Sequence, residues 1–367
     1  MSWLGLEGHD DLVDRFRGTL RAGRLASSYL FVGPEGCGKR SFAIRLARSL
    51  LCERIAVEEL APCGECQGCQ QVQAGTHPDL LSISRPEDRK DIPVDLLIGD
   101  RDHRGRVGLC HDLSLKPFQG DRRIAVLDDA DFLNEEGANC LLKTLEEPPP
   151  RSLLILVGTS AEKQLPTIRS RCQIIRFRPL PIDIASSLLL SNGIAPNAEQ
   201  AEALARCCEG SLVHAQRLAD EELWRFRGEL FSSLARLPNE SVRLSRAITT
   251  CVEAVGKEAP LRRARAAILI GFAIDFYHQL LRAWVAAQQN AQLEGGSSRS
   301  SDAVDPELQA AAAAALASWP GDAEEIARCT DRCLEAANHV DRNANLATLV
   351  ECWIAELAEL SRQVAVH

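Results

Sequence analysis

Short apolar runs alternate with amphipathic segments in the first half of the chain. Residues 9–22 carry apolar side chains at helical spacing and predict an amphipathic helix. Apolar runs that predict buried strands occur at residues 29–32, 80–83, 123–127, 152–157 and 173–177. Between them we expect helices at about 38–51 and from an Asn134 cap to about Glu147, where Pro148 ends the pattern. This alternation favours an α/β fold with a parallel sheet covered on both faces.

The strand pattern stops after Pro179-Leu180-Pro181. Residues 182–219 predict short helices joined at glycines, and the chain from about Asp220 onward predicts helices rich in Ala, Leu and Arg. The stretch 288–305 is rich in Gly and Ser and predicts a flexible interruption between long helices. We therefore expect three domains: an α/β domain at 1–179, a small helical lid domain at 180–219 and an all-helical domain at 220–367.

A glycine-rich turn follows the first apolar run and opens the next helix. Its glycines are Gly33, Gly36 and Gly38. They allow backbone N–H groups to converge on a phosphate at the helix N-terminus, and Lys39 would reach the outer phosphates. The motif requires Ser or Thr next, because that hydroxyl binds magnesium, but Arg40 stands there and Ser41 comes one residue late. We predict a phosphate-shaped loop with weak or vestigial ATP and magnesium binding; the alternative is a loop that binds no nucleotide.

Polar residues follow two of the expected strands. Asp128 comes directly after residues 123–127, where a P-loop ATPase holds its metal, and Asp129 takes the position of the carboxylate that polarises the attacking water. Aspartate is one methylene shorter than the usual glutamate. Both acids also suit a helix N-terminus, which favours negative charge. Thr159 could touch a γ-phosphate, or it could satisfy backbone groups at its strand end.

Four of the fourteen cysteines are clustered. They are Cys52, Cys63, Cys66 and Cys69, with the spacing C-x10-C-x2-C-x2-C. Four thiolates make a closed tetrahedral site, so we predict a structural zinc ion in a module at about 52–79. His77 is the substitute candidate for Cys52, and four free thiols are the alternative to a metal site.

Composition limits the classes of function. The chain has 46% hydrophobic and 25% charged residues and a net charge of −9, which argues against a free-standing nucleic-acid binder. No signal peptide or membrane-spanning run is recognisable, and most cysteines are scattered, so we expect a cytoplasmic protein without membrane contact. The charged segment 85–108 predicts a surface insertion; its arginines could alternatively contact phosphate.

Several tracts of the first 180 residues match one known family. They are Tyr29-Leu30-Phe31, the four cysteines followed by His77-Pro78-Asp79-Leu80, Lys116-Pro117-Phe118-Gln119-Gly120, Asp128–Asp131 with residues 139–149, and residues 165–172, which end in Ser-Arg-Cys. Through them the chain resembles the delta-prime family of subunits of the bacterial DNA polymerase III clamp loader, part of the AAA+ ATPase superfamily. The remaining helices match only in pattern.

The resemblance implies a set of partners and one catalytic residue. Related subunits form an open ring that loads the sliding clamp onto primed DNA, so the implied partners are gamma/tau and delta-type subunits, the clamp and, through the complex, DNA. The arginine of the Ser-Arg-Cys tract, Arg171, would be an arginine finger that stabilises the γ-phosphate of a neighbour's ATP. Residues 220–367 would form the collar that holds the ring together.

The departures from the family pattern bear on the chain's own activity. Arg40 replaces the magnesium hydroxyl, and Val213 stands where hydrolysing members place a nucleotide-sensing arginine after a Gly-Ser pair. We therefore expect little or no ATPase activity from this chain itself. The alternative is an ATP-hydrolysing motor subunit of the gamma/tau type. A zinc enzyme or stand-alone zinc-dependent DNA binder is a further possibility, disfavoured because four thiolates leave no open coordination position.

Overall fold

The chain forms two compact units, residues 1–214 and 215–367. The computed structural model describes residues 3–86, 89–208, 210–236, 240–292, 305–319 and 321–363. The three-domain division expected from the sequence stays a prediction. Its second boundary was expected at residue 219, whereas the two units divide inside helix α10 (Leu212–Leu218).

A five-stranded parallel sheet forms the centre of the first unit. The strands are β1 (Ser28–Val32), β2 (Leu80–Ile83), β3 (Arg123–Leu127), β4 (Ser152–Gly158) and β5 (Gln173–Arg176). Their order is β2-β3-β4-β1-β5, so the strand that enters the glycine-rich loop pairs with β4 on one side and β5 on the other. All five residues of β1 are buried, as expected for a strand covered on both faces.

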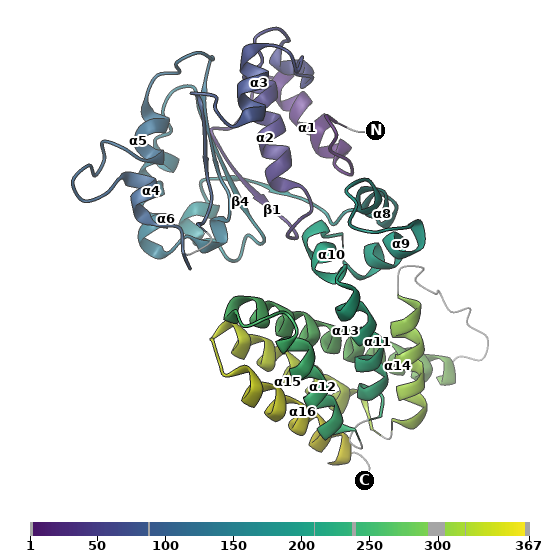
Figure 1. The fold of residues 1–367 in the computed structure, drawn as a ribbon. Helices are drawn as coiled ribbons and strands as arrows, with labels where there is room; N and C mark the ends of the chain where they lie inside the picture. The colour runs from purple at the N-terminus through teal and green to yellow at the C-terminus, as the bar shows by residue number, and fades with distance from the viewer. Residues whose placement is uncertain are drawn as a thin grey trace. The chain divides into compact units, whose positions relative to one another are not determined.

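Helices cover both faces of this sheet (Figure 1). The helices α1 (Asp10–Arg21), α2 (Lys39–Leu50) and α3 (Gln67–Ala74) lie on one side, and α4 (Val94–Ile98), α5 (Leu109–Ser114) and α6 (Glu135–Glu146) lie on the other. Alternate residues of β1 enter the two cores: Phe31 packs with Phe16 and Phe42, and Leu30 belongs to the opposite cluster. The parallel α/β prediction is confirmed.

The segment 85–108 is only partly the surface insertion that its charges predict. Residues 101–107 are exposed, in agreement with the sequence. Ile92 and Leu97, in contrast, are completely buried, and α4 packs against α6. The charged neighbours obscured these two core positions, because α4 is too short to show a helical period in the sequence.

The remaining elements of the first unit are short. They are η1 (Val57–Glu59), η2 (Ala130–Phe132), α7 (Pro166–Arg169), α8 (Ile182–Ser191) and α9 (Ala198–Cys207). The Asn134 side chain caps α6 by accepting a hydrogen bond from the Gly137 amide at 2.8 Å, as the sequence predicts. Among the described residues, no helix of either unit is both long and apolar enough to cross a membrane.

The second unit is entirely helical in its described part. Its helices are α11 (Glu221–Leu234), α12 (Ser241–Glu253), α13 (Ala259–Gln292), α14 (Pro306–Ser318), α15 (Ala323–Asp341) and α16 (Leu346–Gln363). The long α13 packs against both α14 and α15, and Tyr277 and Trp353 are completely buried. The predicted interruption at 288–305 begins later than expected, because α13 continues to Gln292; residues 293–304 lie outside the described part of the chain.

Candidate functional site

The glycine-rich loop connects β1 to α2 in the arrangement that the motif predicts. Gly36 and Gly38 have φ angles of 70° and 97°, in the left-handed region that favours glycine, and Gly38 caps α2. His9 donates from Nε2 to the Cys37 carbonyl at 2.6 Å and so holds the loop from α1. The loop therefore has a defined path over the N-terminus of α2.

The chain packs closely against this loop. A Cβ atom on Gly33 would lie 2.5 Å from the Phe177 carbonyl oxygen, and one on Gly36 would lie 2.7 Å from the Val213 amide nitrogen. The Leu212 amide also donates to the Gly36 carbonyl at 3.4 Å. The start of helix α10 (Leu212–Leu218) thus contacts the loop, and Val213 lies beside it.

Lys39 is turned inward onto its own loop. Its Nζ donates to the carbonyls of Gly33 at 2.7 Å and Pro34 at 2.5 Å, and only 7% of the residue is exposed. Burial lowers the pKa of Lys39, opposed by the nearby Cys37 and Asp128. In this arrangement the ammonium group is satisfied by backbone carbonyls.

Arg40 forms an ion pair at the position expected for magnesium. Its Nε lies 3.2 Å from Asp128 Oδ2, while Asp128 Oδ1 accepts the Asp129 amide at 3.0 Å. Burial raises the pKa of Asp128, with Asp129 adding to the shift and Arg40 opposing it. Ser41 is exposed one residue further along α2. The residues do not fit a magnesium site, because a guanidinium group replaces the hydroxyl ligand and contacts the remaining carboxylate.

Thr159 and Asp131 form a pair that the sequence did not reveal. The Thr159 amide and hydroxyl both donate to Asp131 Oδ2, at 2.8 and 2.5 Å, and Gln164 donates to Oδ1 at 3.0 Å. The Thr159 carbonyl accepts the Gly33 amide at 3.1 Å. Thr159 therefore links the glycine-rich loop to η2. A contact to a γ-phosphate stays a prediction, as does the water-polarising role of Asp129, which has left-handed backbone angles.

Arg171 lies at the edge of the sheet opposite to the loop. It follows α7 and precedes β5, whose first residue Gln173 pairs with Tyr29 near the start of β1. Its Nη2 donates to Glu146 Oε1 at 2.5 Å, and its Nη1 donates to the Thr167 carbonyl at 2.9 Å. The five residues of β1 span about 13 Å, so one arginine side chain does not reach the loop.

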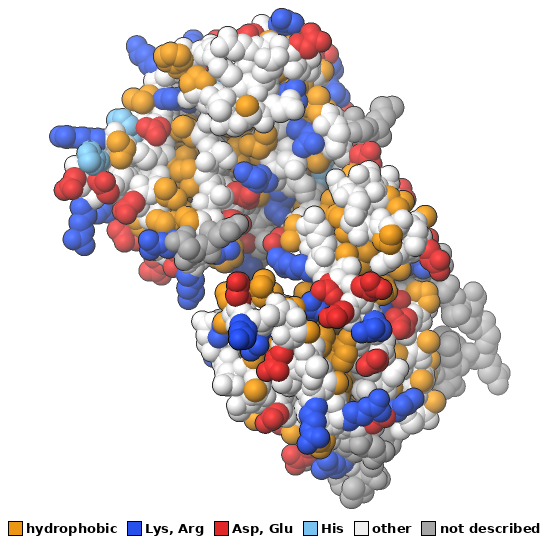
Figure 2. All heavy atoms as spheres, in the orientation of Figure 1, with side chains coloured by type: hydrophobic (Ala, Val, Ile, Leu, Met, Phe, Trp, Pro, Cys, Tyr) orange, Lys and Arg blue, Asp and Glu red, His pale blue; other side chains and the backbone are white. Residues whose placement is uncertain are grey.

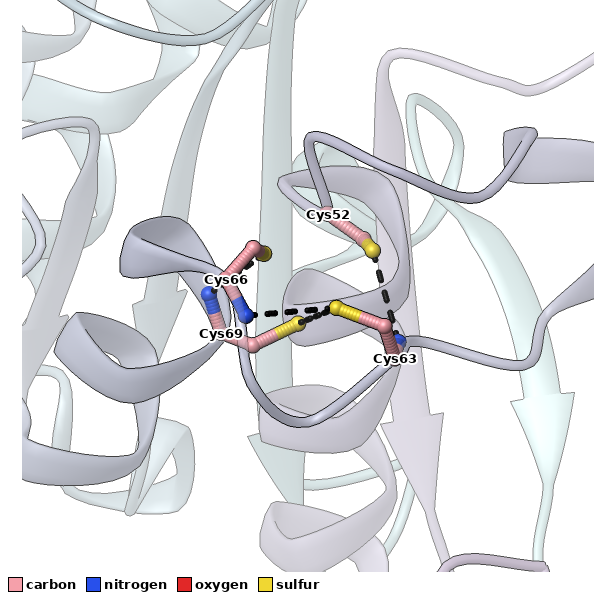
Figure 3. Close-up of side chains that lie close together, drawn as sticks. All are labelled: Cys52, Cys63, Cys66 and Cys69. Carbon is pink, nitrogen blue, oxygen red and sulfur yellow. Dashed lines mark hydrogen bonds between the residues drawn. The ribbon is translucent and has the colours of Figure 1, made fainter.

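The four clustered cysteines converge on one point (Figure 3). Cys52 follows α2, Cys63 lies in the next loop, and Cys66 and Cys69 lie at the start of α3, with all four sulfur atoms within 4.8 Å of one another. The Cys63 and Cys69 sulfurs are 4.0 Å apart, close to the separation of about 3.8 Å expected around a tetrahedral zinc ion. The donor set fits a metal.

Backbone amides surround these sulfurs. The Cys63 amide donates to Cys52 Sγ at 3.4 Å, and the Cys66 amide donates to Cys63 Sγ at 3.3 Å. Burial opposes ionisation of Cys52, but backbone hydrogen bonds outweigh it and lower its pKa to about 6. His77, the alternative ligand, is buried and accepts the Asp79 amide at its Nδ1 at 3.0 Å. The structure thus brings together the four cysteines and gives His77 another role.

The first part of the chain is similar to known proteins. Residues 8–181 match the family model described as DNA polymerase III, delta subunit. This region is similar to that family. The chain is 36% identical over 221 residues to the delta-prime subunit of DNA polymerase III from Pseudomonas aeruginosa, covering 60% of this chain and 64% of the relative. The family resemblance expected from the sequence is confirmed.

Two further relatives come from Escherichia coli. The delta-prime subunit is 31% identical over 215 residues, which are 59% of this chain and 61% of the relative, and the tau subunit is 30% identical over 225 residues, which are 59% of this chain and 32% of the relative. The chain thus spans less than two thirds of the length of each delta-prime relative. The chain is similar to both delta-prime and tau subunits of DNA polymerase III, so the choice between these two types depends on the residues of the site.

Proposed function

We propose that this chain is a delta-prime-like subunit of a replicative clamp loader. It would assemble with gamma/tau and delta-type subunits, load the sliding clamp onto primed DNA through the complex, and donate Arg171 to the ATP of a neighbouring subunit. The match of residues 8–181 to the family model and the likeness to the delta-prime relatives support this proposal. The sliding clamp and primed DNA would bind the assembled loader rather than this chain alone.

The observation that carries the trans role is the position of Arg171. It lies at the amino edge of the parallel sheet, whereas the glycine-rich loop of the same chain lies at the carboxyl edge. A phosphate stabilised by Arg171 would therefore have to belong to another subunit. The Arg171–Glu146 ion pair is partly exposed, and such pairs contribute about 0–1 kcal/mol, so the side chain can leave Glu146 at low cost.

The loop of this chain supports a subunit with little or no ATPase activity. Lys39 is bound to loop carbonyls, and Arg40 contacts the only carboxylate expected to hold metal. Val213 occupies the place of a sensing arginine next to Gly36. A motor subunit of the gamma/tau type is the second candidate, favoured by the tau relative, and it requires hydrolysis by this chain alone.

We further propose that Cys52, Cys63, Cys66 and Cys69 hold a structural zinc ion. Zinc would supply coordination bonds that fix the loop between α2 and α3, and with four thiolates it would have no open position for catalysis. DNA contact would then depend on the assembly. Acidic and basic side chains are mixed over the face of the molecule drawn in Figure 2, in line with the net charge of −9.

The experiment that tests the function is Arg171→Ala in a reconstituted loader. We expect the complex to assemble normally and the ATP site served by this chain to lose at least about 10³-fold in turnover, because an arginine finger acts in the transition state. The measurement is DNA-stimulated ATP hydrolysis by the complex. Arg169→Ala is the matched control, and Arg171→Lys separates charge from the guanidinium fork. Unchanged hydrolysis by an intact Arg171→Ala complex would exclude the finger role.

A further inference from the structure

Buried neighbours hold the backbone around Arg171 in place. Ile168 in α7 and Cys172, the residue that follows Arg171, are both buried. Leu145 is buried in the last turn of α6, and α6 packs against α7. The backbone of Arg171 is therefore fixed relative to the end of α6, and only its long side chain remains to be ordered.

Three acceptors order this side chain. Its Nη2 donates to Glu146 Oε1 at 2.5 Å, whereas its Nη1 donates to the Thr167 carbonyl at 2.9 Å and to Ser170 Oγ at 3.3 Å. The Thr167 and Ser170 acceptors are local, because both residues lie within four positions of Arg171. Glu146 is the acceptor that connects the guanidinium group to a second element, since it is the last residue of α6.

These contacts leave part of the guanidinium group unused. A guanidinium carries more N–H donors than the three contacts occupy. Within the described part of the chain, no acceptor contacts Arg171 Nε, and Nη2 has a second N–H besides the one that Glu146 accepts. A phosphate oxygen can therefore take up these donors before the contact to Glu146 is given up.

The strength of the Arg171–Glu146 pair suits an ordering role. The two side chains are 32% and 50% exposed, and ion pairs with this much solvent contact are weak. A phosphate carries more negative charge than a carboxylate, so it is the stronger partner for the guanidinium group. A pair that retained Arg171 on its own subunit would have to be buried. The contact therefore orders the side chain without trapping it.

We propose that Glu146 is a positioning residue for Arg171. The inference rests on the proposed function, in which Arg171 serves the ATP of a neighbouring subunit. An arginine side chain has many rotamers, and fixing it costs conformational entropy. Glu146 makes the side chain give up this freedom before the phosphate arrives, so less of the cost falls on the transition state. Glu146 acts through Arg171 and does not itself contact the nucleotide.

The experiment measures DNA-stimulated ATP hydrolysis by reconstituted loaders that carry Glu146→Ala, Glu146→Gln or Glu147→Ala. We expect Glu146→Ala to lower kcat at the ATP site served by this chain about fivefold, the largest effect of a partly exposed pair, with an unchanged KM for ATP. Glu146→Gln keeps an acceptor oxygen and should stay within about twofold of wild type. Glu147→Ala removes the same charge one residue further along, where no described contact reaches Arg171, and should hydrolyse ATP as wild type.

A double variant separates positioning from a general structural role. If Glu146 acts only through Arg171, the loader with Glu146→Ala and Arg171→Ala together should hydrolyse ATP at the rate of Arg171→Ala alone. Losses that multiply in the double variant would overturn the positioning role. An unchanged or raised kcat in Glu146→Ala would overturn it as well, and so would equal losses in Glu146→Ala and Glu146→Gln.

The same loaders distinguish failure of this inference from failure of the proposed function. A loss of turnover in Arg171→Ala without any loss in Glu146→Ala would overturn the positioning role and leave the arginine finger standing. Unchanged turnover in Arg171→Ala would overturn the finger and the positioning role together.

Discussion

Arg40 changes the chemistry of the glycine-rich loop while leaving its path intact. A P-loop ATPase needs a hydroxyl at this position and a free carboxylate opposite it. This chain has a guanidinium at the first position, 3.2 Å from the second. One residue therefore removes a magnesium ligand and also occupies the remaining one, which is a stronger effect than the missing hydroxyl alone predicts.

Arg40→Ser should restore part of the metal site. We expect magnesium to strengthen ATP binding by the purified variant at least about tenfold, because the serine hydroxyl and a released Asp128 become available as ligands. Calorimetric titration with and without magnesium measures this. Arg40→Ala releases Asp128 without supplying the hydroxyl and is the matched control. Equal behaviour of the two variants would contradict the explanation.

The sequence predicted the loop residues because their chemistry is local. Glycines at fixed spacing, a lysine and a helix start are all visible within eight residues. Asp131 escaped notice because its partners, Thr159 and Gln164, are about 30 positions away in the chain. The Arg171–Glu146 pair escaped for the same reason. Pairings between distant side chains depend on the fold, which a local pattern does not contain.

At the scale of elements, the long and strongly patterned ones were predictable and the short ones were not. The helices α1, α2 and α6 lie within one or two residues of their predicted bounds. The helices α4 and α5 have only five and six residues, and no period is recognisable over so few positions. Their buried side chains nevertheless belong to the core between the sheet and the helices α4, α5 and α6.

Leu97→Ala should show that α4 belongs to the core. We expect the free energy of unfolding to fall by about 2–5 kcal/mol, because the substitution leaves a cavity at a completely buried position. Urea denaturation gives this value. The neighbouring Leu96 is 37% exposed, so Leu96→Ala is the control, with an expected loss below about 1 kcal/mol. Equal losses in the two variants would indicate that the segment is a surface insertion after all.

For the whole molecule, the fold class was predictable and the arrangement of strands was not. Apolar runs separated by helices indicate a parallel sheet, but they do not state that β1 lies between β4 and β5. Because β5 pairs with β1 in this order, Arg171 lies near the start of β1, whereas the glycine-rich loop follows the end of β1 at the other edge of the sheet. For the second unit the sequence predicted only helices, because no catalytic or binding motif was recognised there.

The two units should respond separately to core substitutions. Each has its own buried core, so Leu97→Ala should lower the melting temperature of one transition and Leu357→Ala that of another. Differential scanning calorimetry resolves the transitions. Leu334→Ala, at a position of 45% exposure on α15, should shift neither. A single transition that both core variants lower equally would mean that the units unfold as one.

The close packing around Gly33 and Gly36 has a consequence for evolution. A side chain at either position would collide with the backbone of Phe177 or Val213, whether or not a phosphate is ever bound. Selection for the fold alone is then sufficient to retain these glycines. A descendant of an ATPase that lost hydrolysis entirely would still keep these glycines. Their presence therefore indicates ancestry and close packing, and it does not indicate activity. Activity is better judged from residues that can change without disturbing the fold. Arg40 is such a residue, because its side chain is largely exposed.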